Sequence, residues 1–237
     1  MAGEQESIAS EQLLLTVAEQ LKLPLLQIAR QAEQAQLTGE TSHQATIRST
    51  AESALRLLDY YALGIRLHHQ AGQLDMEPVS IAAVLYDAGQ QLTGLARAYG
   101  VDLDLHIAGK FGPVIAHRQG LQAALVSLGA AFIEALPAHE STGQLKLQLA
   151  THRCRYGIVA GLYTDDAQLT AAQLRQGRRL LAQSRQPLVG FSPSSGAGIF
   201  VADSILQAMQ LRLRSSRHHG LFGLGAVLTP TNQLQLV

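Results

Sequence analysis

An unbroken heptad pattern of apolar residues between positions 47 and 68 most constrains the fold of this chain. Its members recur at alternating steps of four and three, which places them on one stripe of a helix. An earlier run, from about residue 8 to residue 35, has the same helical spacing. Between the two lies a polar turn at 37–42, in which Thr41 or Ser42 is a suitable N-cap. The two runs therefore predict an antiparallel helical hairpin.

The apolar stripes of this hairpin are too wide for two helices to bury alone. We expect two chains to pack their hairpins, residues 1–74, into a four-helix bundle. Packing of the hairpin on the rest of its own chain is the alternative. The predicted dimer seam consists of Leu14, Val17 and Leu21 on the first helix and Leu58, Tyr61 and Ile65 on the second.

Residues 75–237 form a second predicted domain in which strands and helices alternate. Period-2 patterns predict strands, and longer apolar runs with periods of three and four predict helices. This order predicts an α+β fold, an α/β-layer sandwich with helices on one face of a mixed sheet. The predicted strands are 101–107, 112–116, 143–150, 155–163, 211–215, 221–229 and 233–237, after a short strand or connector at 75–80, and the predicted helices are 81–99, 117–137, 170–183 and the part of 194–210 that follows its glycines.

The composition limits the classes of partner. Hydrophobic residues make up 47% of the chain and charged residues 15%, which favours a folded protein. The formal net charge is zero, so there is no general electrostatic attraction to nucleic acid or to an anionic membrane. A single cysteine, Cys154, excludes an internal disulfide, and no apolar run reaches the ~20 residues that cross a bilayer. These features predict a cytoplasmic protein without membrane insertion.

A helical hairpin followed by such an α+β domain resembles the core of bacterial sensor histidine kinases. That core joins a dimerisation and phosphotransfer hairpin to an ATP-binding domain of the GHKL type. The order of elements matches over nearly the whole chain, and "LDMEPVSIAAVL" at 74–85 is similar to the family's linker between the two domains. The resemblance implies the fold of that core. Comparison with the family's motifs shows where this chain departs from the family.

The phosphoacceptor motif of the family is similar to "EQLKLPL" at 19–25, but its histidine is missing. Pro24 and Lys22 match the proline and the basic position of the motif. Glu19 stands at the histidine position and Gln20 at the acidic position after it, and no histidine occurs before residue 43. Phosphotransfer in the family uses an imidazole nitrogen as the nucleophile that attacks the γ-phosphate. The resemblance therefore implies that the acceptor has been lost.

The family's Mg²⁺-binding asparagine lies on the helix that matches 117–137. By register, the two asparagine-type positions of that helix hold Ser127 and Ala131. Since Mg²⁺ takes oxygen ligands, Ala131 cannot bind it through its side chain. The resemblance implies a weakened or absent metal site.

Two further motifs of the family are partly present. Thr164 aligns with the aspartate that reads adenine; Asp165 or Asp166 serves in its place if the register shifts, but the two glycines of that motif are absent. Gly196 and Gly198 match the glycines that support the phosphates at a helix N-terminus, where free N–H groups bind anions. A tight helix entry with close packing is the alternative role for these glycines. The nucleotide-binding remnant would thus comprise Asp165, Asp166, Gly196 and Gly198.

The histidines suggest no metal site by themselves. Adjacent residues such as His68–His69 do not face one site on a helix, since ligand pairs need spacings of three or four. His218–His219 is expected in a turn before the last hairpin. The pair could join a transition-metal site, but no partner is evident. His117 is expected near the edge of the nucleotide region, exposed to solvent. Cys154 is expected to be a small core or edge residue.

Together these features predict a catalytically inactive relative of the histidine kinases, a pseudokinase rather than an enzyme. It would be a dimeric adaptor or regulator whose partner is a response-regulator receiver domain or a true histidine kinase. No cofactor or metal is expected. Two alternatives remain open: a nucleotide-binding or ATPase protein that still takes ATP and Mg²⁺, and a phosphotransfer relay that uses His43 or His68.

Overall fold

The computed structural model describes residues 74–107, 109–135, 146–165 and 197–231, together with helical positions scattered between 28 and 67. Several predictions fall outside these residues: the phosphoacceptor region at Glu19, Gln20, Lys22 and Pro24, most of the seam at Leu14, Val17, Leu21, Tyr61 and Ile65, and Asp166 and Gly196 of the nucleotide remnant. The predicted helix 170–183, the predicted strand 233–237, and His43, His68 and His69 also lie outside them. The boundary between residues 74 and 75 stays a prediction.

The described elements follow the predicted order. They are β1 (Glu77–Val79), α3 (Ile81–Ala98), β2 (Asp102–Ile107), β3 (Val114–Ala116), α4 (Arg118–Ala135), β4 (Lys146–Cys154), β5 (Gly157–Thr164), α6 (Ala197–Ala208), β6 (Leu213–His218) and β7 (Leu221–Leu228). Strand β4 is longer than predicted, because it stays paired with β5 as far as Cys154 opposite Gly157. None of the helices in the described part of the chain combines the length and the apolarity that a bilayer crossing requires.

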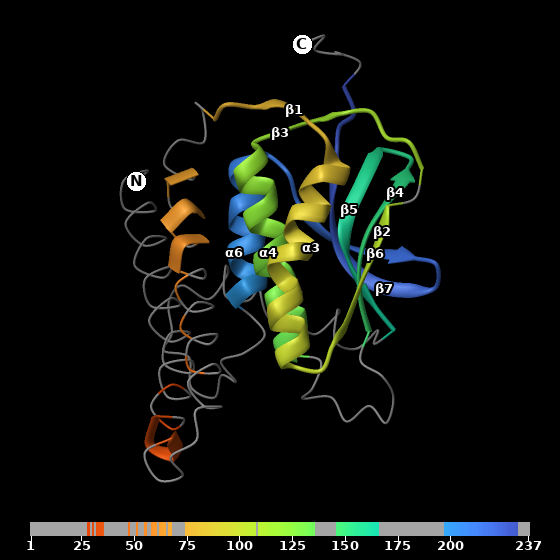
Figure 1. Ribbon diagram of the computed structural model, residues 1–237. Helices are drawn as coiled ribbons and strands as arrows, with labels where there is room; N and C mark the ends of the chain where they lie inside the picture. The colour runs from red at the N-terminus through yellow and green to blue at the C-terminus, as the bar shows by residue number, and fades with distance from the viewer. Residues whose placement is uncertain are drawn as a thin grey trace, which may run out of the picture.

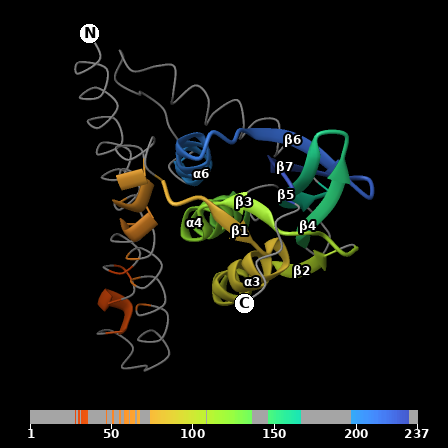
Figure 2. The same ribbon diagram turned by 90° about the horizontal axis from the view of Figure 1, so that it is seen from above.

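A mixed five-stranded sheet forms one layer of the domain and three helices form the next (Figure 1). The strand order is β2-β4-β5-β7-β6, in which β2 and β4 are parallel and the other neighbours antiparallel. Strands β1 and β3 pair separately. Helices α3, α4 and α6 all lie on the same side of the large sheet, as Figure 2 shows from above. This arrangement confirms the predicted α+β fold.

The core lies between the helices and the sheet, and it is closely packed around α4. Phe132 on α4 and Leu162 on β5 are fully buried. A methyl group on Gly129 of α4 would lie 2.3 Å from Leu92 Cδ1 on α3 and 3.2 Å from Leu162 Cδ2. Each large apolar side chain buried here contributes ~1.5–3 kcal/mol. Gly129 therefore lets one side chain of α3 reach the backbone of α4.

The second helix of the predicted hairpin packs on this domain. It presents a stripe at helical spacing, made of Tyr60, Leu63, Gly64 and Leu67. Leu67 is buried, a methyl group on Gly64 would lie 3.3 Å from Ile205 Cγ1 of α6, and the Tyr60 hydroxyl donates to the side chain of Gln91 on α3. These described residues of the second helix therefore pack on their own chain, as the alternative expects for the hairpin. The neighbouring stripe with Leu58, which is half-buried, belongs to the predicted seam, and dimerisation through it stays a prediction.

Three glycines bring β5 and β7 together on the sheet face that points away from the helices. A Cβ atom on Gly223 would lie 2.0 Å from the Leu162 carbonyl oxygen, and one on Gly161 would lie 2.4 Å from the Leu224 carbonyl oxygen. A Cβ on Gly225 would lie 2.8 Å from Val159 Cγ1. Backbone atoms thus occupy the space that side chains would fill, and glycine in a strand marks such close approaches.

We expect Gly223→Ala to destabilise the fold strongly. The added methyl group would meet a carbonyl oxygen of the backbone, which cannot move away as the end of a side chain can, so the free energy of unfolding should fall by about 3 kcal/mol. The measurement is urea denaturation followed by circular dichroism.

Gly94→Ala is the matched control for this substitution. Gly94 is exposed on α3, and a Cβ there would meet nothing within 4 Å. Alanine should stabilise the helix by about 0.5–1 kcal/mol. Equal stability of the two variants would contradict the close approach of β5 and β7.

Candidate functional site

Gly198, in the first turn of α6, lies directly on α4 at the two positions aligned with the metal-binding asparagine. A Cβ atom on Gly198 would lie 2.6 Å from the Ser127 carbonyl oxygen and 2.9 Å from Ala131 Cβ. Ser127 and Ala131 are both buried. Close packing on α4 by itself requires glycine at residue 198. This is the alternative role given for the motif, a tight helix entry rather than phosphate binding. The structure brings together Ser127, Ala131 and Gly198, which come from two separate motifs.

The Ser127 hydroxyl is the only side-chain oxygen that these two α4 positions offer. It is fully buried, and none of the residues that the structure describes is its hydrogen-bond partner. A buried polar group without a partner costs about 1–3 kcal/mol. Mg²⁺ demands six oxygen ligands in octahedral geometry, several of them usually water. A buried hydroxyl beside a methyl group offers one oxygen ligand at most, which does not favour such a site.

The end of β5 carries the residues aligned with the adenine-reading aspartate. Thr164 is buried and pairs with Phe222 of β7, while Asp165 is exposed. The Thr164 hydroxyl donates to Asp165 Oδ1 at 3.2 Å. Asp165 is therefore an exposed carboxylate directly after the end of β5, the central strand. Its part in nucleotide binding stays a prediction.

His117 and Cys154 have structural roles. His117 is half-buried before α4, and its Nδ1 accepts from the Gly120 backbone N–H at 3.0 Å, which caps the free N–H groups of that helix. Cys154 is half-buried at the end of β4, where its sulfur accepts from the Tyr156 N–H at 3.4 Å. The half-buried position of Cys154 agrees with the expected small core or edge residue. The sequence did not predict the capping role of His117, which was expected to be exposed and is half-buried.

A cluster of histidines lies on the face of the sheet opposite the helices. His106 Nδ1 is 2.7 Å from His218 Nε2, and the His152 ring stacks on that of His218 with 5.0 Å between centroids and 17° between planes. His219 completes the cluster, 4.3 Å from the His218 ring centroid. The expectation that His218–His219 has no partner was wrong. Strand alternation places Asp104 and His106 on one face of β2, but nothing in the sequence indicates that β2 meets β6.

A polar network lies next to these histidines. The Tyr163 hydroxyl donates to Ser216 Oγ at 3.3 Å and lies 3.4 Å from His152 Nδ1. Ser216 Oγ is in turn 3.5 Å from His152 Nε2. Burial raises the pKa of Tyr163 to about 12, so this phenol keeps its proton at neutral pH.

Two of these histidines, His218 and His152, have lowered pKa values, which favours their neutral form. Burial, and then the neighbouring His219, His152 and His106, lower the pKa of His218 to about 4. Burial and then His219 also lower the pKa of His152. Neutral imidazoles keep a free nitrogen lone pair, so they accept hydrogen bonds or bind metal ions.

Comparison with known proteins identifies the fold but no sequence family. No family model matches the chain, and no curated protein matches it in sequence. The chain is similar in structure to full-length ShkA in complex with AMPPNP, with 13% identity and a TM-score of 0.52; the match covers 95% of this chain and 46% of that one. It is also similar to a bacterial phosphotransferase, with 12% identity, a TM-score of 0.50, and coverage of 92% and 94%.

A further similar structure is the Acinetobacter baumannii histidine kinase AdeS, with 13% identity and a TM-score of 0.48. The match covers 90% of this chain and 98% of that one. The described α+β domain has a fold of the histidine kinase ATPase type, as the order of its elements predicts.

We expect Ser127→Ala to raise the free energy of unfolding by about 1 kcal/mol, because it removes a buried hydroxyl without a partner. Thermal and urea denaturation measure this change. Ser80→Ala is the matched control: the Ser80 hydroxyl accepts from the Ala83 N–H as N-cap of α3, so its loss should destabilise by about 1 kcal/mol. Destabilisation by Ser127→Ala would show that the hydroxyl has a partner after all.

The low pKa of His218 predicts a loss of stability in acid. Between about pH 4, its folded-state pKa, and 6.5, the ordinary value, the unfolded chain binds more protons than the folded chain. The free energy of unfolding should therefore fall as the pH drops through this range, with no contribution from His218 at higher pH. The measurement is urea denaturation across this range in the presence of EDTA.

In His218→Gln the fall with decreasing pH should be shallower, because one of the groups that must be charged has been removed. Wild type and His218→Gln share every other titrating residue. The quantity to compare is therefore the slope of the free energy of unfolding against pH, not its absolute value. The same slope in wild type and variant would contradict the lowered pKa of His218.

Proposed function

We propose that this chain is a catalytically inactive histidine-kinase-like protein of the cytoplasm, which serves as a dimeric adaptor or regulator in a two-component pathway. The observation that carries the proposal is the packing of Gly198 on Ser127 and Ala131. In an active kinase core this part of the fold holds Mg²⁺ and phosphates. Here the aligned positions of α4 carry a buried hydroxyl and a methyl group, and Gly198 packs directly on them, which supports the proposal.

The loss of the phosphoacceptor supports the same conclusion. Glu19 occupies the aligned histidine position. A carboxylate lacks the imidazole lone pair that attacks the γ-phosphate and holds the phosphoryl group as a phosphoramidate. Its permanent negative charge would instead imitate a phosphorylated acceptor. The chain would thus have lost both the phosphoacceptor and the ability to take a phosphoryl group from ATP. It would keep the scaffold that partners recognise.

The role of adaptor follows from what the scaffold retains. One stripe of the second helix, with Leu63 and Leu67, is already used against the chain's own domain. The adjacent heptad stripe, with Leu58, is left for a second chain. A hairpin dimer of this kind would offer its helices to a receiver domain or to a true histidine kinase.

The test is phosphorylation with γ-labelled ATP and Mg²⁺, using the full chain and, in parallel, an active histidine kinase as a positive control. We expect no labelled protein from this chain. Label that is lost in Glu19→Ala and released by hydroxylamine would identify an acyl phosphate and contradict the proposal. Label that passes to this chain from a phosphorylated receiver domain, and that is lost in His43→Gln or His68→Gln, would support the relay alternative instead.

Nucleotide binding is tested separately by calorimetry with ATP and ADP. We expect no saturable binding. Gly198→Val is unsuitable as a test variant, since its side chain would collide with α4 and disturb folding. Asp165→Asn is better, because it keeps the size of an exposed side chain and removes only its charge. Micromolar binding that Asp165→Asn abolishes would favour the nucleotide-binding alternative over the proposal.

A further inference from the structure

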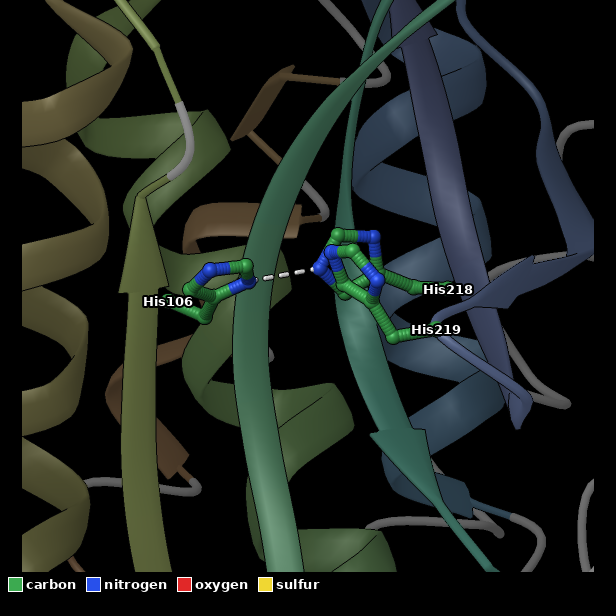
Figure 3. A group of neighbouring side chains, drawn as sticks. All are labelled: His106, His218 and His219. Carbon is green, nitrogen blue, oxygen red and sulfur yellow. Dashed lines mark hydrogen bonds between the residues drawn. The ribbon is translucent and has the colours of Figure 1, made fainter.

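Three imidazoles from distant parts of the chain converge on the outer face of the sheet (Figure 3). His106 comes from β2, His218 ends β6, and His219 lies in the turn between β6 and β7. One ring nitrogen from each of the three lies within 4.8 Å of the other two. His218 is buried, His106 half-buried and His219 exposed, so the cluster opens to solvent on one side.

The sheet must coil strongly for this contact to form. Strands β2 and β6 are the two edges of the five-stranded sheet, and in a flat sheet they would be about 19 Å apart, at ~4.8 Å per strand. Two histidine side chains cannot span that distance. The row of cross-strand neighbours that starts at His106 continues through Ala150, Gly161 and Gly225. These three residues carry no side chain larger than a methyl group, and the row ends at Arg214 on β6. The strands between the two edges therefore place no large side chain directly beside His106 in this row.

The turn after β6 brings His219 to the same place. Successive residues of a strand point to opposite faces, which would separate His218 from His219. His219 instead has a φ of +48°, and Gly220 follows with +83°. Positive φ at both central residues is typical of a two-residue hairpin turn, where asparagine or glycine is usual at the first position. A histidine held in this uncommon conformation turns its ring toward His218, at 4.3 Å between centroids.

We infer that His106, His218 and His219 form a binding site for one divalent transition metal ion of the Zn²⁺ type. Imidazole nitrogens suit Zn²⁺, Cu²⁺ and Ni²⁺, whereas Mg²⁺ takes oxygen ligands, so this is not the metal of kinase chemistry. Three histidines leave a fourth tetrahedral position for water or another ligand. The exposed side at His219 supplies that position.

The geometry needs little change to accept the ion. Zn–N bonds of about 2.0–2.1 Å in tetrahedral geometry place two ligand nitrogens roughly 3.3 Å apart. His106 Nδ1 and His218 Nε2, now 2.7 Å apart, would move apart by roughly 0.6 Å to reach that spacing. His152 stacks on His218 and is itself bonded to Ser216, so it holds the buried ligand ring in place.

A purely structural cluster explains these observations less well. The His106–His218 hydrogen bond accounts for one pair of rings. It does not account for His219, which is exposed and sits in a conformation where a smaller residue is usual. The site lies across the sheet from α4 and α6, so it is independent of the proposed loss of kinase activity.

The test is titration of the full chain, produced without a histidine tag, with Zn²⁺ by isothermal calorimetry. We expect one ion per chain. His219→Asn and His106→Gln should each weaken binding by more than about tenfold, since the loss of even an outer-shell partner usually has that effect. Asparagine tolerates the positive φ at residue 219, so the turn is preserved in the first variant. Co²⁺ gives a second readout through the visible absorption of a four-coordinate site.

His117→Asn is the matched control. It removes a histidine elsewhere in the domain, and asparagine can replace it as the N-cap of α4. Zn²⁺ affinity should be unchanged in this variant, and circular dichroism should show that all three variants are folded. The absence of saturable binding, half an ion per chain, or equal affinity in wild type and both ligand variants would overturn the inference.

Discussion

Backbone contact at glycine positions sets the distances between the layers of this domain. Gly198 brings α6 onto the backbone of α4, Gly129 admits a side chain of α3, and Gly161 and Gly223 bring β5 against β7. Close-packed interiors have no spare volume, so one methyl group at such a position must displace backbone. The helix layer, the coil of the sheet and both candidate sites depend on these contacts.

The two faces of the domain have different chemical content. Between α4 and α6 lie a glycine, a methyl group and a hydroxyl that has no partner among the described residues. On the far side of the sheet, four histidines, a tyrosine and a serine form a connected polar group. Buried polar groups are kept when they are satisfied or functional, since each costs free energy otherwise. The proposed metal site therefore lies on the face of the sheet opposite α4 and α6.

Much of the fold could be predicted from the sequence because it depends on local patterns. The periodicity of 81–99 gave α3, closed by Gly100 with its positive φ of +68°, and the alternation in 101–107 gave β2. The weakened metal site implied by the aligned positions Ser127 and Ala131 stays a prediction. Two predictions rest on periodicity alone and stay predictions. One is that residues 1–74 form a separate unit, and the other is the dimer seam through Leu58.

The sequence by itself determined the element order, the faces of the strands and the absence of histidine at residue 19, because each depends on neighbours along the chain. Only the tertiary structure decided that Tyr60 and Leu67 pack on the chain's own domain, that Gly198 fills the space beside Ser127, and that His106 meets His218. The last of these joins residues 112 positions apart across three intervening strands. Such a contact depends on how far the sheet coils, and coiling is set by the summed packing of many residues rather than by any local pattern.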